Sequence, residues 1–99
     1  EIDNKFEFDM DGKKVFPRVI KCDLDDELVQ FSLECAVDSL KKYSIEKDIA
    51  DYIKKQFDDN LEEYWHIVVG GDFSVSLSHN SRNFIFFLIE KTYFVIFKL

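Results

Sequence analysis

The sequence predicts one α+β domain in which two helices pack on a mainly antiparallel sheet. Helical patterns lie together between residues 25 and 57, whereas strand-like patterns occupy most of residues 65–98. When helices and strands are segregated along a chain, the strands pair antiparallel and the helices cover the sheet. The 99 residues are 46% hydrophobic and 16% aromatic, which suffices for one core and is too short for two domains.

The N-terminal residues 1–18 differ in pattern from the rest of the chain. Charged and apolar residues alternate from Lys5 to Met10, and Asp11-Gly12 is typical of a hairpin turn that leads into a return strand at Lys13–Phe16. A mobile leader is the alternative interpretation. A further hypothesis is that this alternating segment extends the sheet or occupies a binding groove. A short strand is expected next, at Arg18–Cys22.

Two helices are expected from their caps and their apolar spacing. The first begins at Asp25-Asp26-Glu27, whose carboxylates suit a helix N-terminus, and ends near Lys41-Lys42. Its apolar face consists of Val29, Leu33, Ala36, Val37 and Leu40. The second runs from Glu46 to Phe57 and repeats apolar residues every fourth position, with its exit at Asp58-Asp59-Asn60. Residues 61–64 are expected to be a linker.

Four strands are expected in the C-terminal half. Their ranges are 65–69, 73–78, 83–89 and 93–98. Glycines in Gly70-Gly71-Asp72 favour a tight turn after the first strand. Asn80-Ser81 is the next turn, and the turn at Glu90-Lys91-Thr92 has no glycine.

The segment 73–78 alternates apolar and serine side chains without interruption. This period of two places Phe73, Val75 and Leu77 on one face and Ser74, Ser76 and Ser78 on the other. At the edge of a sheet, the unpaired N–H and C=O groups of such a strand accept another chain. The sequence therefore predicts binding by strand addition.

Composition and motifs argue against most other functions. The net charge of −7 disfavours nucleic acid as a partner, and no apolar run reaches the ~20 residues that span a bilayer. The spacing of Cys22 and Cys35 matches no zinc or redox motif. We therefore expect both thiols to be reduced, and we expect neither a bound metal nor a cofactor. Cys35 lies among apolar helix residues, where a thiol is inert. The acidic cluster 23–27 lacks calcium-loop spacing, and we expect no enzyme.

Several longer motifs resemble the dynein light chain family of the eight-kilodalton type. They are Glu34-Cys35-Ala36, Tyr43-Ser44-Ile45-Glu46-Lys47-Asp48-Ile49-Ala50, Ile53-Lys54-Lys55, Phe57-Asp58, Trp65-His66, Val69-Gly70, Phe84-Ile85 and Phe97-Lys98. The resemblance implies a light chain domain at 19–99, preceded by an extension at 1–18. It also implies a non-catalytic homodimer of the dynein motor complex, located in the cytoplasm on microtubules.

In this family the strand equivalent to 73–78 crosses to the partner's sheet, and target segments add to its free edge. The implied partners are a dynein intermediate chain and other proteins with Thr-Gln-Thr-like motifs. The implied groove residues are Lys21, Asp23, Glu46, Lys47, Phe73, Ser74, Val75, Ser76, Leu77, Ser78, His79, Phe84, Phe86 and Leu88. The implied dimer interface is His66, Phe73, Val75, Leu77 and Ser78.

Two of these assignments have a physical reason. Glu46 and Lys47 match the helix start that receives the target glutamine, whose carbonyl caps free N–H groups. His66 matches an interface histidine, so the dimer is expected to weaken in mild acid. A histidine satisfied within the protomer core is the alternative interpretation of His66.

Other positions depart from the family pattern. Ser74 replaces a glycine, Ser76, Phe86 and Leu88 replace tyrosines, and Glu90 replaces a turn glycine. The groove thus loses phenolic hydroxyls and ring area, which is expected to shift the Thr-Gln-Thr preference. The alternative function is therefore a dedicated structural subunit of one cytoplasmic or axonemal motor, with a narrowed groove.

Overall fold

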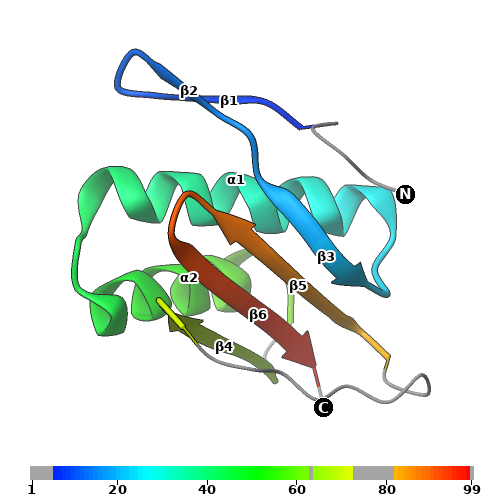
Figure 1. The fold of residues 1–99 in the computed structure, drawn as a ribbon. Coiled ribbons are helices and arrows are strands. Elements are labelled where there is room, and N and C mark those ends of the chain that lie inside the picture. Colours follow the sequence, from blue (N-terminus) through cyan, green and yellow to red (C-terminus); the bar gives the residue numbers. More distant parts are fainter. Residues whose placement is uncertain (1–5, 63, 73–81, 99) are drawn as a thin grey trace.

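The computed structural model describes residues 6–62, 64–72 and 82–98. Its elements are β1 (Phe8–Met10), β2 (Lys13–Val15), β3 (Arg18–Cys22), α1 (Asp26–Lys42), α2 (Glu46–Asn60), β4 (Trp65–Gly70), β5 (Phe84–Ile89) and β6 (Thr92–Lys98). A four-stranded antiparallel sheet has the order β3-β5-β6-β4, and both helices cover one of its faces (Figure 1). The α+β prediction is confirmed.

The core lies between this sheet and the helices. Alternate residues of the two central strands are buried against the helices: Ile85, Phe87, Ile89, Phe94 and Ile96. Phe87 and Phe94 stack with ring centroids 4.9 Å apart. On the helix side, the ring of Phe57 in α2 packs against the ring of Trp65, with ring centroids 5.2 Å apart. Aromatic packing therefore joins the helix layer to β4.

A bulge in β3 sets which of its side chains face outward. The register with β5 shifts between Val19 and Lys21. One extra residue lets Val19 and Cys22, three positions apart, both face the core, whereas Ile20 and Lys21 are exposed. Nothing in the alternation of this short strand indicated the bulge.

Helix α1 begins and ends as expected. Asp25 is its N-cap, and its side chain accepts a hydrogen bond of 2.9 Å from the Leu28 N–H. Two lysines occupy the last turn before Tyr43, which adopts an extended conformation. The apolar face found in the sequence is buried at Val29, Leu33, Ala36 and Val37.

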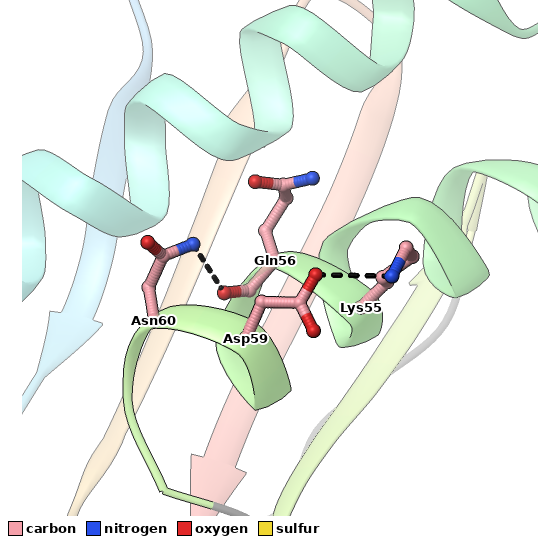
Figure 2. A network of polar contacts seen from close by, with 4 residues as sticks. All are labelled: Lys55, Gln56, Asp59 and Asn60. Atoms are coloured by element: carbon pink, nitrogen blue, oxygen red, sulfur yellow. Dashed lines mark hydrogen bonds and ion pairs between the residues drawn. The ribbon is translucent and has the colours of Figure 1, made fainter.

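Helix α2 is longer than its apolar pattern predicts. The expected end at Phe57 is wrong, because the helix continues to Asn60. Side-chain contacts one turn apart hold this last segment: Lys55 pairs with Asp59 at 3.0 Å, and the Asn60 amide donates to the Gln56 carbonyl (Figure 2). Apolar periodicity stops at Phe57 only because the remaining turn does not face the core.

Strand boundaries also differ slightly from expectation. Gly70 and Thr92 belong to β4 and β6, whereas Asn83 precedes β5. Between the paired residues Ile89 and Thr92, a two-residue turn places Glu90 at φ 56°. Glu90 therefore adopts a left-handed conformation that glycine reaches without steric cost.

Residues 8–15 form a hairpin that is separate from the main sheet. Strands β1 and β2 pair with each other around Asp11 and Gly12, which both have positive φ. The hairpin lies alongside α1 (Figure 1), and Val15 is only 1% exposed. Lys13 also pairs with Glu90 at 2.9 Å. Within the protomer, the hypothesis that this segment extends the sheet is therefore wrong.

Val15 is expected to anchor this hairpin. Val15→Ala removes two buried methyl groups and is expected to lower the free energy of unfolding by about 2 kcal/mol. Lys14→Ala, which removes an exposed ion pair with Glu7, is the control and should leave the free energy of unfolding nearly unchanged. Urea unfolding measures both, and equal small losses would show that the hairpin contributes nothing to the core.

Candidate partner-binding surface

The sheet face that points away from the helices is largely apolar. Because alternate residues enter the core, the others face outward. On β4, β5 and β6 this outer face consists of His66, Val68, Phe84, Phe86, Leu88, Tyr93, Val95 and Phe97. Val68 is 46% exposed, which is unusual for a valine in the middle of a strand. An apolar face of this kind is typical of a protein interface.

Strand β4 lies at one end of the sheet. It pairs with β6 on one side, and within the described part of the chain no strand pairs with its other side. A groove of ≈ 380 Å³ runs between this edge and α2. Its lining residues are Ala50, Asp51, Lys54, Trp65, His66, Ile67, Val68 and Phe97. The edge thus offers main-chain hydrogen-bonding groups beside a hollow that admits an extended segment.

His66 lies on the outer face beside this edge. Its side chain is exposed, and its ring stacks on Phe97 with centroids 5.3 Å apart and planes at 25°. The interpretation of His66 as a histidine buried in the protomer core is therefore wrong. Any partner that covers the outer face also covers His66.

The start of α2 lacks a side-chain cap. Its N-cap residue is Ile45, whose side chain has no polar atom to accept a hydrogen bond from a first-turn N–H. Glu46 and Lys47 are exposed there, and the Glu46 carboxylate lies near Gly71 at the end of β4. A hydrogen bond from Lys47 to Asp51 raises the pKa of Lys47. This helix start can accept a carbonyl or carboxylate from outside.

The two groove-edge candidates near β3 have different surroundings. Lys21 is exposed and lies opposite Phe86. Asp23 instead fixes the segment that leads into β5. Its carboxylate accepts a hydrogen bond of 2.9 Å from the Asn83 N–H, and its own backbone N–H donates a hydrogen bond to the Phe84 carbonyl. Asn83 has φ 56° and accepts from the Lys98 N–H. Sequence reasoning missed Asn83, although asparagine's tolerance of positive φ is a usable signal.

Asp23 is expected to be a structural residue first. Asp23→Ala should lower the free energy of unfolding by about 1 kcal/mol, because the Asn83 N–H loses its acceptor. Asp23→Asn keeps an acceptor oxygen and should lose less than half of that, as measured by urea unfolding. If Asp23→Ala does not change the free energy of unfolding, Asp23 has no structural role, and contact with a partner remains as its role.

The structure brings together part of the sequence-predicted site. Phe84, Phe86, Leu88 and His66 share the outer face. Seven further candidates lie outside the described residues: Phe73, Ser74, Val75, Ser76, Leu77, Ser78 and His79. The described part of the candidate site therefore consists of β3, β4, β5, β6 and the start of α2.

The described residues offer little for catalysis. Burial raises the pKa of the Cys35 thiol to about 12, so it is not a thiolate at neutral pH. No group of three or more His, Cys, Asp or Glu side chains in the described ranges is placed to hold a metal ion. Among these residues, no helix is both long and apolar enough to cross a membrane.

Comparison with known proteins identifies the family of this chain. A family model described as "Dynein light chain type 1" matches residues 17–99. The chain is also 36% identical over 85 residues to "Dynein light chain, cytoplasmic" from Emericella nidulans, which covers 86% of this chain and 90% of that relative. The resemblance found in the sequence is confirmed, and the chain belongs to the dynein light chain family.

Proposed function

We propose that this protein is a non-catalytic homodimeric light chain of the dynein motor complex that binds short extended segments of partner proteins. The observation that carries the proposal is the outer edge of β4, with which no strand in the described ranges pairs and which adjoins an apolar outer face and a groove of ≈ 380 Å³. Strand addition uses such an edge: main-chain hydrogen bonds supply affinity, and side-chain pockets supply selection.

The outer face supports dimerisation. Exposed Val68 and the stacked pair of His66 and Phe97 offer apolar area that a second copy would bury. In the proposed dimer, residues 73–78 of each subunit pair with the β4 edge of the partner's sheet, and a target segment adds to the outer edge of this crossed strand. Two parallel grooves would then bind paired targets more tightly than single ones, because the second contact is intramolecular.

The start of α2 supports recognition of a glutamine-containing motif. With Ile45 as N-cap, the first-turn N–H groups are left for a target carbonyl, beside Glu46 and Lys47. We propose a dynein intermediate chain and other proteins with Thr-Gln-Thr-like segments as partners. The relative from Emericella nidulans is named cytoplasmic, which supports a cytoplasmic, microtubule-associated location for this chain as well.

The second candidate is a dedicated structural subunit of a single motor. Phe86 and Leu88 favour it, because they lie on the outer face at positions where the family resemblance implies tyrosines, and Leu88 has no ring or hydroxyl to offer a ligand. Such a subunit would retain the dimer and lose general peptide binding.

A peptide panel distinguishes the two functions. Immobilised peptides of unrelated sequence, half of them carrying Thr-Gln-Thr, are probed with the purified protein, and a parallel pull-down from cell extract identifies its complexes. The adaptor function predicts binding to several Thr-Gln-Thr peptides. Binding to none of them, together with recovery of one motor complex, would establish the dedicated subunit.

A further inference from the structure

Helix α2 has acidic and aromatic side chains along one stripe of its surface. Asp48, Asp51, Tyr52 and Lys55 lie three or four positions apart, which places them on one face of the helix. Together with Tyr43, the C-cap of α1, they line a hollow of ≈ 230 Å³, which we call the tyrosine hollow. Among the described residues, none from a strand lines this hollow, so it is separate from the outer face of the sheet.

The two tyrosine rings of the hollow are arranged to hold a cation. Their centroids are 6.0 Å apart, and their planes are tilted by 50°. The Lys42 ammonium lies over the Tyr52 ring, 4.8 Å from its centroid, which is within the range of a cation–π contact. Tyr43 is 41% exposed, and no described cation lies over its ring. The chain thus places one cation on this aromatic pair and leaves the second ring accessible.

The hollow also offers a carboxylate that can pair with a cation. Asp48 is half-buried, and within the described residues its side chain accepts no hydrogen bond and forms no ion pair. By contrast, Asp51 is paired with Lys47 at 2.9 Å. Lys55 is likewise paired with Asp59, at 3.0 Å (Figure 2). Asp48 is therefore the carboxylate of the hollow that has no cation in contact, on a chain whose net charge of −7 attracts cationic partners.

We propose that the tyrosine hollow binds an arginine side chain of a partner protein segment. The planar guanidinium of arginine stacks on an aromatic ring, here Tyr43, and pairs with a carboxylate, here Asp48, through two parallel hydrogen bonds. The volume of ≈ 230 Å³ lies below the roughly 300–1,000 Å³ of small-molecule sites and suits a single side chain. Ile45, which is 62% exposed two residues after Tyr43, offers apolar area to the neighbouring residues of the segment.

This binding mode does not depend on dimerisation or on strand addition. The hollow is formed by α2 and the end of α1, and these helices lie on the sheet face opposite the outer face (Figure 1). Of its lining residues, only Asp51 also lines the groove beside β4. An arginine-bearing segment and a Thr-Gln-Thr-like segment are therefore expected to bind the same subunit at the same time.

A titration followed by two-dimensional NMR tests the inference. The probes are the peptide Leu-Gly-Arg-Gly-Leu and two versions with Lys or Gln at the central position. Backbone amide shifts around the hollow should saturate with the Arg peptide, with about threefold weaker affinity for the Lys peptide and at least about tenfold weaker affinity for the Gln peptide. A saturating Thr-Gln-Thr peptide should not displace the Arg peptide. Equal binding of the three probes, absence of binding, or displacement would overturn the inference and leave the proposed function intact.

Substitutions at the hollow locate the binding. Tyr43→Ala and Asp48→Asn should each weaken binding of the Arg peptide by about fivefold or more, since each removes one of the two contacts. Tyr64→Ala removes another exposed tyrosine, and Glu7→Gln removes one negative charge from the N-terminal hairpin. Both of these control variants should bind like the unchanged chain. Unchanged affinity in the two variants of the hollow, with the dispersed amide spectrum of a folded protein, would overturn the inference.

Lys42→Met tests whether the ligand and Lys42 use the same aromatic pair. This change removes the cation that lies over Tyr52 and keeps an apolar side chain, so binding of the Arg peptide should tighten by about twofold or more. Lys14→Met, with the same change in net charge on the hairpin, is the control and should not tighten binding as much. Weaker binding by Lys42→Met would overturn the inference, because Lys42 would then assist the ligand instead of competing with it.

Discussion

His66→Lys is expected to convert the proposed dimer into a monomer. In the protomer this side chain stacks on Phe97 and is exposed, so a lysine there is tolerated before association. In the proposed dimer the same position is covered, and a permanent charge would be buried without a partner. Such a charge costs about 3–5 kcal/mol, which raises the dimer dissociation constant by roughly 100-fold or more.

Sedimentation equilibrium over micromolar concentrations measures this shift. Ser44→Lys, at an exposed position between the helices, adds the same charge and should leave the dimer unchanged. Circular dichroism should show that both variants keep the native fold. A folded His66→Lys protein that stays dimeric at low micromolar concentration would show that the outer face is not the interface.

Phe87→Ala is expected to give the largest loss of stability. Phe87 is 0% exposed on the central strand β5 and stacks on Phe94 at 4.9 Å. Removing its ring leaves a cavity in the middle of the core and should lower the free energy of unfolding by about 3–5 kcal/mol. Because domains of this size are stable by roughly 5–15 kcal/mol, the variant will be marginal.

Urea unfolding at one fixed protein concentration compares Phe87→Ala with Phe16→Ala. Phe16 is 48% exposed, so the same chemical change should cost less than about 1.5 kcal/mol there. The fixed concentration matters because association contributes to the measured stability. Similar losses in the two variants would contradict the position of the core.

Features with strong local chemistry were predictable from the sequence. The Asp25 cap and terminal lysines set the limits of α1, and apolar alternation indicated the strands around Phe87 and Phe94. The end of α2 at Asn60 was missed because side-chain pairs, and not burial, hold its last turn. The β3 bulge was missed because one inserted residue leaves no signal in a strand of five residues.

The candidate site was predictable mainly through the family motifs. They implied Phe86 in the peptide groove and His66 at the dimer interface, and the strand register places both on the outer face. Asp23 was expected to contact partners, and its bond to the Asn83 N–H was not foreseen. That bond joins residues 60 apart in the chain, so local sequence patterns contain no information about it.

Calorimetric titration with a Thr-Gln-Thr peptide is the sharpest test of the proposed strand addition. The purified protein, shown to be folded and dimeric, is titrated at neutral pH with a short peptide that contains the motif. We expect micromolar binding at one peptide per subunit, because each subunit of the proposed dimer contributes one groove. Absence of heat, together with absence of competition against any bound target segment, would contradict it.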